Sequence, residues 1–157
     1  MSDEIRTWDN QVLPALFEGS SAAKETVILL HGIFSSRDES GRFVRQSQMH
    51  QSHGRRVIRY DARCHGASNA PRASIRVSDH VADLMTTSRW TRMHSQRVFM
   101  VASSYGGGIA LLAHGVGLAG LIDRLVLLNP VVDFRSSFVE RRRERSCPIV
   151  GGNSFSA

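Results

Sequence analysis

Apolar residues in this chain gather in short unbroken runs, separated by polar segments. Residues 26–30 (TVILL), 98–102 (VFMVA) and 125–128 (LVLL) contain mainly β-branched and aliphatic side chains. A run without polar alternation is typical of a strand covered on both faces, as in a parallel sheet. Residues 57–61 (VIRYD) predict a further strand between the first two. The pattern therefore predicts a mostly parallel sheet.

Segments between these strands follow a helical period. Residues 77–90 carry apolar side chains at helical spacing, and we expect Ser78 to cap this helix. Residues 109–113 continue as a helix after the third strand, and residues 35–53 predict a short helix. Strands that alternate with helices indicate right-handed βαβ units, with helices on both faces of the sheet.

The two ends of the chain depart from this alternation. Residues 4–8 and 12–17 are apolar runs on either side of a turn-forming segment, Asp9-Asn10-Gln11, and predict a hairpin. After Phe138 the sequence has no helix or strand period and a sudden charge run. We therefore divide the chain into an α/β domain, residues 1–138, and an off-pattern tail, residues 139–157, which we expect to be disordered.

Composition narrows the class of protein. The chain has 157 residues, 41% hydrophobic and 22% charged, which is ordinary for one globular domain. No stretch approaches the roughly 18 apolar residues of a membrane span. The first ten residues lack the basic and then apolar layout of a signal peptide. We therefore expect a cytoplasmic protein without a membrane span.

A net charge of +6 raises the alternative of a nucleic-acid-binding protein. However, Lys24 is the only lysine, and the arginines are spread along the chain apart from one cluster at 141–145. No nucleic-acid-binding motif or interleaved aromatic residue accompanies them, so we expect no nucleic-acid partner. Cys64 and Cys147 have no metal-ligand spacing, and we expect two free thiols.

The sharpest chemical signal follows the strand at 98–102, in the segment Ala102-Ser103-Ser104-Tyr105-Gly106. A nucleophile elbow needs small residues two positions before and two after its serine, here Ala102 and Gly106. The following helix directs its N-terminal N–H groups toward developing negative charge. Two alternatives stay open: Ser104 as a helix N-cap, and a phosphate loop, which is weaker because no Gly-Lys-Ser/Thr follows.

The second signal is the segment His31-Gly32-Ile33, which directly follows the strand at 26–30. An acyl hydrolase needs a backbone donor from such a loop to complete its oxyanion hole. The N–H groups of Ile33 and Tyr105 are the candidate donors. We interpret His31 as a structural residue.

A third signal, Asp-x-Arg-x-His-Gly-x-Ser, covers residues 61–68. Together, and in this order, the three motifs resemble the α/β-hydrolase superfamily over about residues 4–138. Residues 98–138 are most similar to the acyl transferases (thioesterases) of bacterial luminescence and to related carboxylesterases. The resemblance implies an α/β-hydrolase fold with its C-terminal strands missing, through a truncation or a shifted reading frame. Cys64 stands where the superfamily usually has glycine, which suggests a differently bent loop.

The superfamily orders its triad as serine, acid and histidine. After Ser104 the only histidine is His114, ten residues or ~15 Å along a helix, so we interpret it as structural. Asp123 precedes its strand, at the wrong end of the sheet. Asp133 follows that strand, where we favour a loop-capping role over a catalytic one.

The resemblance implies a serine acyl hydrolase or thioesterase, or an acyl transferase. Ser104 would attack the acyl carbonyl, while Ile33 and Tyr105 hold the oxyanion. The bulky Tyr105 would cover the serine or line an acyl pocket. The implied substrate is a small acyl ester or thioester, including an acyl group on a carrier protein, and no metal or organic cofactor is implied. The alternative is an inactive hydrolase remnant or acyl-binding module. The sequence leaves self-association open.

Overall fold

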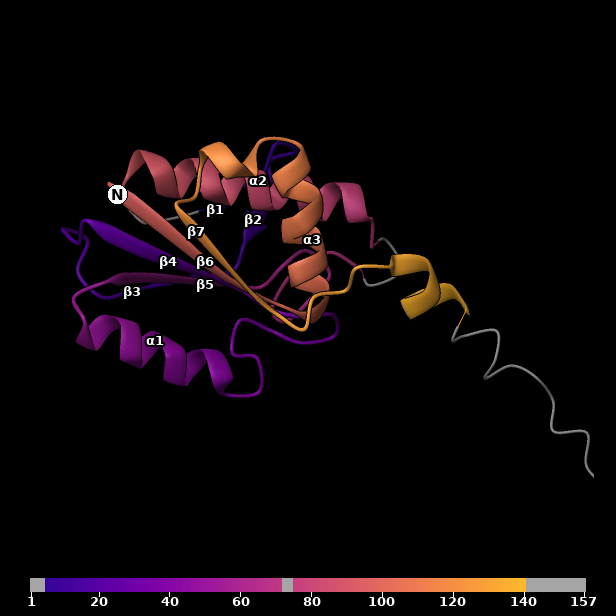
Figure 1. Ribbon diagram of the computed structural model, residues 1–157, viewed down its shortest axis with the longest axis horizontal. Coiled ribbons are helices and arrows are strands. Elements are labelled where there is room, and N and C mark those ends of the chain that lie inside the picture. Colours follow the sequence, from indigo (N-terminus) through magenta and orange to yellow (C-terminus); the bar gives the residue numbers. More distant parts are fainter. Residues whose placement is uncertain (1–4, 72–74, 141–157) are drawn as a thin grey trace, which may run out of the picture.

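The computed structural model describes residues 5–71 and 75–140, with side chains up to Phe138 (Figure 1). Its centre is a five-stranded sheet with the strand order β3-β5-β4-β6-β7. The strands are β3 (Ala15–Glu18), β4 (Glu25–Leu30), β5 (Arg56–Tyr60), β6 (Arg97–Ser103) and β7 (Arg124–Leu128). All four predicted strands are thus confirmed, within one or two residues of their expected ends.

The four strands β5, β4, β6 and β7 run parallel, and β3 adds an antiparallel edge. In the register of β4 and β6, Leu30 lies opposite Ala102. The residues that follow these two strands therefore emerge side by side. This places the loop after Leu30 next to the segment that begins at Ser103.

The predicted hairpin is confirmed in part. Strands β1 (Ile5–Arg6) and β2 (Val12–Leu13) pair antiparallel in a separate two-stranded sheet. The predicted run 12–17 is divided at Pro14, after which the chain enters the central sheet as β3. Proline lacks a backbone N–H and cannot continue a ladder as a donor, but its carbonyl accepts the N–H of Asp61 at 2.8 Å.

Helices cover both faces of the sheet (Figure 1). Helix α1 (Arg42–Ser52) lies on one face, and α2 (Val77–Met93) and α3 (Ser104–Gly115) lie on the other. Two short turns, η2 (Leu118–Gly120) and η3 (Arg135–Glu140), flank β7. The prediction that Ser78 caps α2 is wrong, because this helix begins at Val77. Arg76 therefore occupies the N-cap, no side chain caps the helix, and Ser78 lies within the first turn.

The alternation of side chains along the strands produces two apolar layers. Toward α2 and α3, buried residues include Ile28, Ile58 and Met100. Toward α1, Val27 and Val57 pack with others around helix residue Phe43. The prediction of strands covered on both faces is therefore confirmed for β4 and β5.

The predicted domain boundary at residue 138 falls within η3. The arginine cluster at 141–145 and Cys147 lie outside the described residues, as does most of the predicted tail. In the described part of the chain, Cys64 is buried. No helix there is both long and apolar enough to cross a membrane.

Candidate active site

The chain turns abruptly from β6 into α3 at Ser104. Ser104 has φ +49°, in the left-handed region that side chains other than glycine rarely adopt. Its neighbours Ser103 and Tyr105 are buried, whereas Ser104 is partly exposed. The alternative of Ser104 as a helix N-cap is wrong: Ser103 takes that position, in an extended conformation, and no side chain caps the helix. The strained backbone thus presents Ser104 at the carboxyl end of the sheet.

Three glycines allow α3 to approach its surroundings closely. A Cβ atom on Gly106 would overlap the carbonyl oxygen of His31, and one on Gly108 would overlap that of Val131. A Cβ atom on Gly107 would lie 2.9 Å from the Cβ of Pro130. The backbone N–H of Val131 also donates to the Ser104 carbonyl at 3.0 Å. The elbow is thus held between the loop after β4 and the loop after β7.

The loop after β4 passes directly beside Ser104. A Cβ atom built on Gly32 would lie 3.2 Å from the Cβ of Ser104. The next residue, Ile33, is half-buried. In the part of the chain that the structure describes, its backbone N–H makes no hydrogen bond. An N–H group without an internal partner, one residue from this contact, is available to a negatively charged oxygen.

The imidazole of His31 fixes this loop, as the sequence predicts. Its Nδ1–H donates to the Gly32 carbonyl at 2.7 Å, and its Nε2 accepts the Ala62 N–H at 3.0 Å. Because the ring is buried, the pKa of His31 is lowered and the neutral form is favoured. Both ring nitrogens are thus occupied, and His31 has a structural role.

Glu39 joins the loop after β4 to the elbow. Its carboxylate accepts the Gly32 N–H at 3.1 Å and the hydroxyl of Ser103 at 2.8 Å. Burial alone raises its pKa, but hydrogen bonds from Ser35, Gly32 and Ser103 outweigh burial, and the net pKa is lowered. Sequence reasoning missed this residue, because it lies in a polar segment where no period or motif marks it.

The motif at residues 61–68 forms a scaffold beneath the site. The Asp61 carboxylate accepts the N–H groups of Arg37 at 2.7 Å and Ala67 at 3.0 Å. Gly66 has φ +52°, and a Cβ atom there would overlap the Asp61 carboxylate, so the position requires glycine. Cys64 has φ +67°, which puts a cysteine in backbone that favours glycine.

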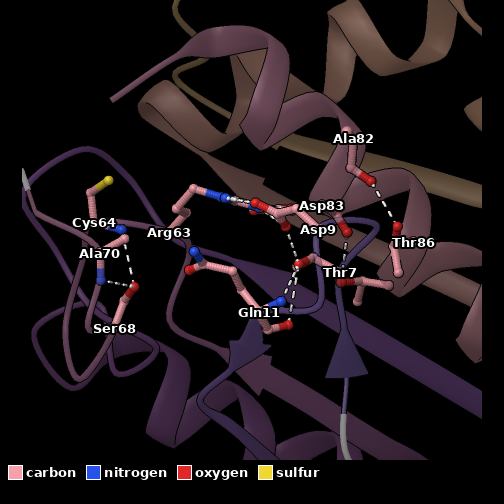
Figure 2. Close-up of polar contacts among 11 residues, drawn as sticks. Thr7, Asp9, Gln11, Arg63, Cys64, Ser68, Ala70, Ala82, Asp83 and Thr86 are labelled. Carbon is pink, nitrogen blue, oxygen red and sulfur yellow. Dashed lines mark hydrogen bonds and ion pairs between the residues drawn. The ribbon is translucent and has the colours of Figure 1, made fainter. Parts of the chain in front are cut away.

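Arg63 of the same motif is 6% exposed and lies between two carboxylates (Figure 2). It donates to Asp9 at 2.6 and 2.9 Å and to Asp83 at 3.0 and 2.8 Å. These ion pairs raise the pKa of Arg63, and the bond from Arg63 lowers that of Asp9. The pKa of the more deeply buried Asp83 is raised, because burial outweighs the guanidinium. Arg63 thus ties the β1–β2 hairpin to α2.

The side chain of Tyr105 points into the protein interior. It is buried against the rings of His65, His80, Phe134 and Phe138. The cavity that it lines has a volume of about 10 Å³, room for about one water molecule. The expectation that Tyr105 covers Ser104 or lines an acyl pocket is therefore wrong. Tyr105 contributes to the surface of the elbow through its backbone alone.

The residues that were weighed for the triad and set aside in the sequence lie away from Ser104 or have other partners. His114 is exposed near the far end of α3. Asp123 accepts the Val98 N–H at 2.7 Å and pairs with Arg92, at the opposite end of the sheet. Asp133 accepts the N–H groups of Arg135 at 2.9 Å and Ser136 at 3.1 Å, so its predicted loop-capping role is confirmed. Among residues 5–71 and 75–140, no histidine is hydrogen-bonded to Ser104.

The strand order, the elbow and the loop beside it define an α/β-hydrolase fold. A family model described as serine aminopeptidase, S33, matches residues 21–149. The chain belongs to this hydrolase family, and the predicted fold class is confirmed. No curated protein matches the chain significantly.

Solved structures similar to this chain include several esterases. The Pyrococcus furiosus esterase Pf2001 is 25% identical with a TM-score of 0.75, over 91% of this chain and 56% of that one. The Exiguobacterium antarcticum esterase EaEST is 24% identical with a TM-score of 0.69, over 83% and 46%. Est1E from Butyrivibrio proteoclasticus, solved with ferulic acid, is 19% identical with a TM-score of 0.72, over 82% and 53%. The chain thus spans about half the length of these structures.

Proposed function

We propose that this chain carries the nucleophile and the oxyanion hole of a serine ester hydrolase. The observation that carries the proposal is the strained φ of +49° at Ser104, with Gly32 packed against the same residue. A residue is held in such a conformation only where its surroundings enforce it, and such strain is concentrated at active sites. The partly exposed position of Ser104 among buried neighbours supports the same role.

In the proposed reaction, the Ser104 hydroxyl adds to the acyl carbonyl and loses its proton to a base. The carbonyl oxygen becomes an oxyanion, which accepts hydrogen bonds from the N–H groups of Ile33 and Tyr105. Glu39 holds the Gly32 N–H, and so fixes the loop from which Ile33 donates. Collapse of the tetrahedral adduct breaks the bond to the alkoxide, which takes the proton from the protonated base and leaves as the alcohol. Water then hydrolyses the acyl-serine and frees the Ser104 hydroxyl. In this proposal the base lies outside the described residues.

The proposed substrate is a small acyl ester. Two of the similar structures are named esterases, and a third holds ferulic acid, which supports this substrate class. Thioester hydrolysis, acyl transfer and an acyl-carrier-protein substrate belong to the narrower resemblance to luminescence acyl transferases. They stay predictions. An assay that compares an oxygen ester with the matching thioester separates these activities.

Hydrolysis of p-nitrophenyl acetate and butyrate by the purified chain tests the proposal. The Ser104→Ala variant removes the nucleophile, and Ser78→Ala, at an exposed serine of α2, is the matched control. We expect Ser78→Ala to retain the original rates, and Ser104→Ala to lose the part of the rate that an external base restores. The assay is repeated with added imidazole, which supplies an external base. A rate that Ser104→Ala leaves unchanged, with and without imidazole, would contradict the proposal.

A second candidate is a catalytically inactive ester-binding protein. One observation favours it: the described residues provide Ser104 with no histidine partner. This candidate predicts that p-nitrophenyl esters bind, and that their turnover does not depend on Ser104. Titration calorimetry with a non-hydrolysable acyl phosphonamide, beside the hydrolysis assay, distinguishes the two candidates.

A further inference from the structure

Three buried rings meet beneath the elbow, on its interior side. His65 follows β5, His80 lies in α2, and Tyr105 is the second residue of α3; they are 3%, 4% and 4% exposed. The ring centroids lie 5.6 Å apart for the two histidines, 6.4 Å for His65 and Tyr105, and 5.4 Å for His80 and Tyr105. We name these three residues the histidine–tyrosine cluster.

Each ring of the cluster has a polar atom that is not satisfied by protein. In the described part of the chain, the Nε2 atoms of His65 and His80 and the hydroxyl of Tyr105 are buried without a hydrogen-bond partner. An unpaired buried polar group costs about 1–3 kcal/mol, so three of them together are unusual. All three residues line the same cavity of about 10 Å³.

The hydrogen bonds of the other ring nitrogens determine which partner would fit. Nδ1–H of His65 donates to the Arg63 carbonyl at 2.8 Å, and His80 also hydrogen-bonds the backbone of Arg63. With Nδ1 protonated in a neutral imidazole, Nε2 is an acceptor. Among the residues that line the cavity, these three thus provide two acceptors and one hydroxyl that can donate.

We propose that this cavity is a binding site for one internal water molecule. The water donates its two hydrogens to Nε2 of His65 and of His80, and accepts the hydroxyl hydrogen of Tyr105. A single water supplies two donors and an acceptor, and the cavity volume matches one water. The bound water links the loop after β5, helix α2 and the elbow through hydrogen bonds. This site is independent of the proposed ester hydrolysis.

The pattern needs a neutral imidazole at His80, and the surroundings of His80 favour that form. Burial, together with the nearby His65, His31 and Arg63, lowers the pKa of His80 to about 4. A metal ion is the rival occupant. In the described residues, no group of three histidine, cysteine, aspartate or glutamate side chains could hold one.

A high-resolution crystal structure of the whole chain tests the proposal. We expect one density peak in the cavity, about 2.7–3.2 Å from each of the three polar atoms. An empty cavity would overturn the proposal. A peak with ligand distances of about 2.0–2.1 Å and anomalous scattering would also overturn it, in favour of a metal.

A measurement in solution tests the same site without crystals. Nitrogen-15 NMR of the histidine rings is expected to show Nδ1–H tautomers for both His65 and His80; an Nε2–H tautomer at either ring would contradict the pattern. Oxygen-17 relaxation dispersion is expected to show one long-lived water fewer in Tyr105→Phe than in the original chain. The control is Tyr60→Phe: this buried tyrosine lines the same cavity, but its hydroxyl already bonds Thr87. An equal count in Tyr105→Phe and the original chain would refute the water site.

Discussion

The two edges of the central sheet differ in how completely the described chain covers them. At the β3 edge, Glu18 accepts two hydrogen bonds from the buried guanidinium of Arg59, at 2.6 and 2.9 Å. Phe17 packs against Trp90 with ring centroids 5.1 Å apart, and the Arg56 guanidinium lies 5.3 Å from the Phe17 ring. This edge, with β5, β4 and β6, is the packed side of the molecule.

At the β7 edge the apolar surface is open. Val126 of β7 is 51% exposed, and Val116, just after the neighbouring helix α3, is 65% exposed. Among the described strands, β7 pairs with β6 alone, as β3 at the other edge pairs with β5 alone, so the two edges differ in side-chain cover and not in pairing. We call β7 and the outer surface of α3 the open side. A free strand edge beside exposed apolar side chains is a site for pairing with further polypeptide.

The candidate site lies on the packed side, away from the less completely covered open side. Ser104 and Gly32 lie where β6 and β4 end, on the packed side. The chain spans about half the length of the similar esterases. We infer that the packed side carries most of the folding free energy, and that the open side contributes little.

The largest expected effect is the loss of Arg63, which leaves Asp9 and Asp83 without their shared partner on the packed side. Arg63→Met is expected to reduce the free energy of unfolding by about 3–5 kcal/mol. The control, Arg92→Met, breaks a more exposed pair with Asp123 and should cost about 1 kcal/mol or less. Urea unfolding followed by circular dichroism measures both. Equal losses would contradict the contrast.

Acid is expected to have the second-largest effect on stability, through protonation of the buried His80. His80 has an unfolded pKa of 6.5 and a folded pKa of about 4, so the unfolded chain binds the proton more tightly. Stability is therefore complete above pH 6.5 and is lost as the pH falls toward 4, by about 3 kcal/mol from this histidine. The charged groups around it include Arg63 and Asp83.

Urea unfolding at several pH values measures the acid effect. The His80→Phe variant is the comparison, because it removes the titrating imidazole and should flatten the profile between pH 6.5 and 4. A loss of stability in this range that is the same in both proteins would show that another group is responsible.

Substitution of a closely packed glycine in α3 is expected to reduce stability by an intermediate amount. Gly106→Ala forces a methyl group onto the backbone of β4 and should cost about 1–3 kcal/mol, with a loss of any Ser104-dependent hydrolysis. Gly115→Ala, at the other end of the same helix, meets no atom within 4 Å and should be neutral or slightly stabilising. Thermal unfolding of both variants measures the difference. A Gly106→Ala protein as stable as the original would contradict the close approach.

The smallest expected changes in stability come from removing methyl groups from one valine on each side. Val57→Ala removes buried methyl groups from β5 and should cost about 2 kcal/mol. Val126→Ala, at the exposed position of β7, should change stability by about 0.5 kcal/mol or less. Urea unfolding of the two variants gives both values. Similar costs would show that Val126 is covered in solution, as self-association through the open side would do.

The sequence predicted the strands well, because buried parallel strands need unbroken apolar runs, as in residues 26–30 and 98–102. The hairpin was predicted less completely, since one apolar run contains Pro14 and enters two different sheets. The cap of α2 was missed because helix periodicity does not determine which residue begins the helix. Ser78 has the right chemistry for a cap and lies two residues too late.

The motifs predicted where the candidate site lies, but not the side chains that surround it. The elbow around Ser104 has a local sequence signature, because a tight turn needs small residues at fixed positions. Glu39 and His80 have no local sequence signature. A loop brings Glu39 to the site, and helix α2 brings His80 beneath the elbow, in both cases through tertiary contacts. The inward direction of Tyr105 was also beyond local patterns, because the packing of α2 against α3 determines it.

Covalent labelling of the folded chain tests whether Ser104 is the nucleophile. The purified protein is treated with a fluorophosphonate probe, with and without added imidazole, and the modified peptide is identified by mass spectrometry. We expect phosphonylation at Ser104, which disappears in Ser104→Ala and persists in Ser78→Ala. Labelling that leaves Ser104 unmodified, or that is equally strong in Ser104→Ala, would contradict this role of Ser104.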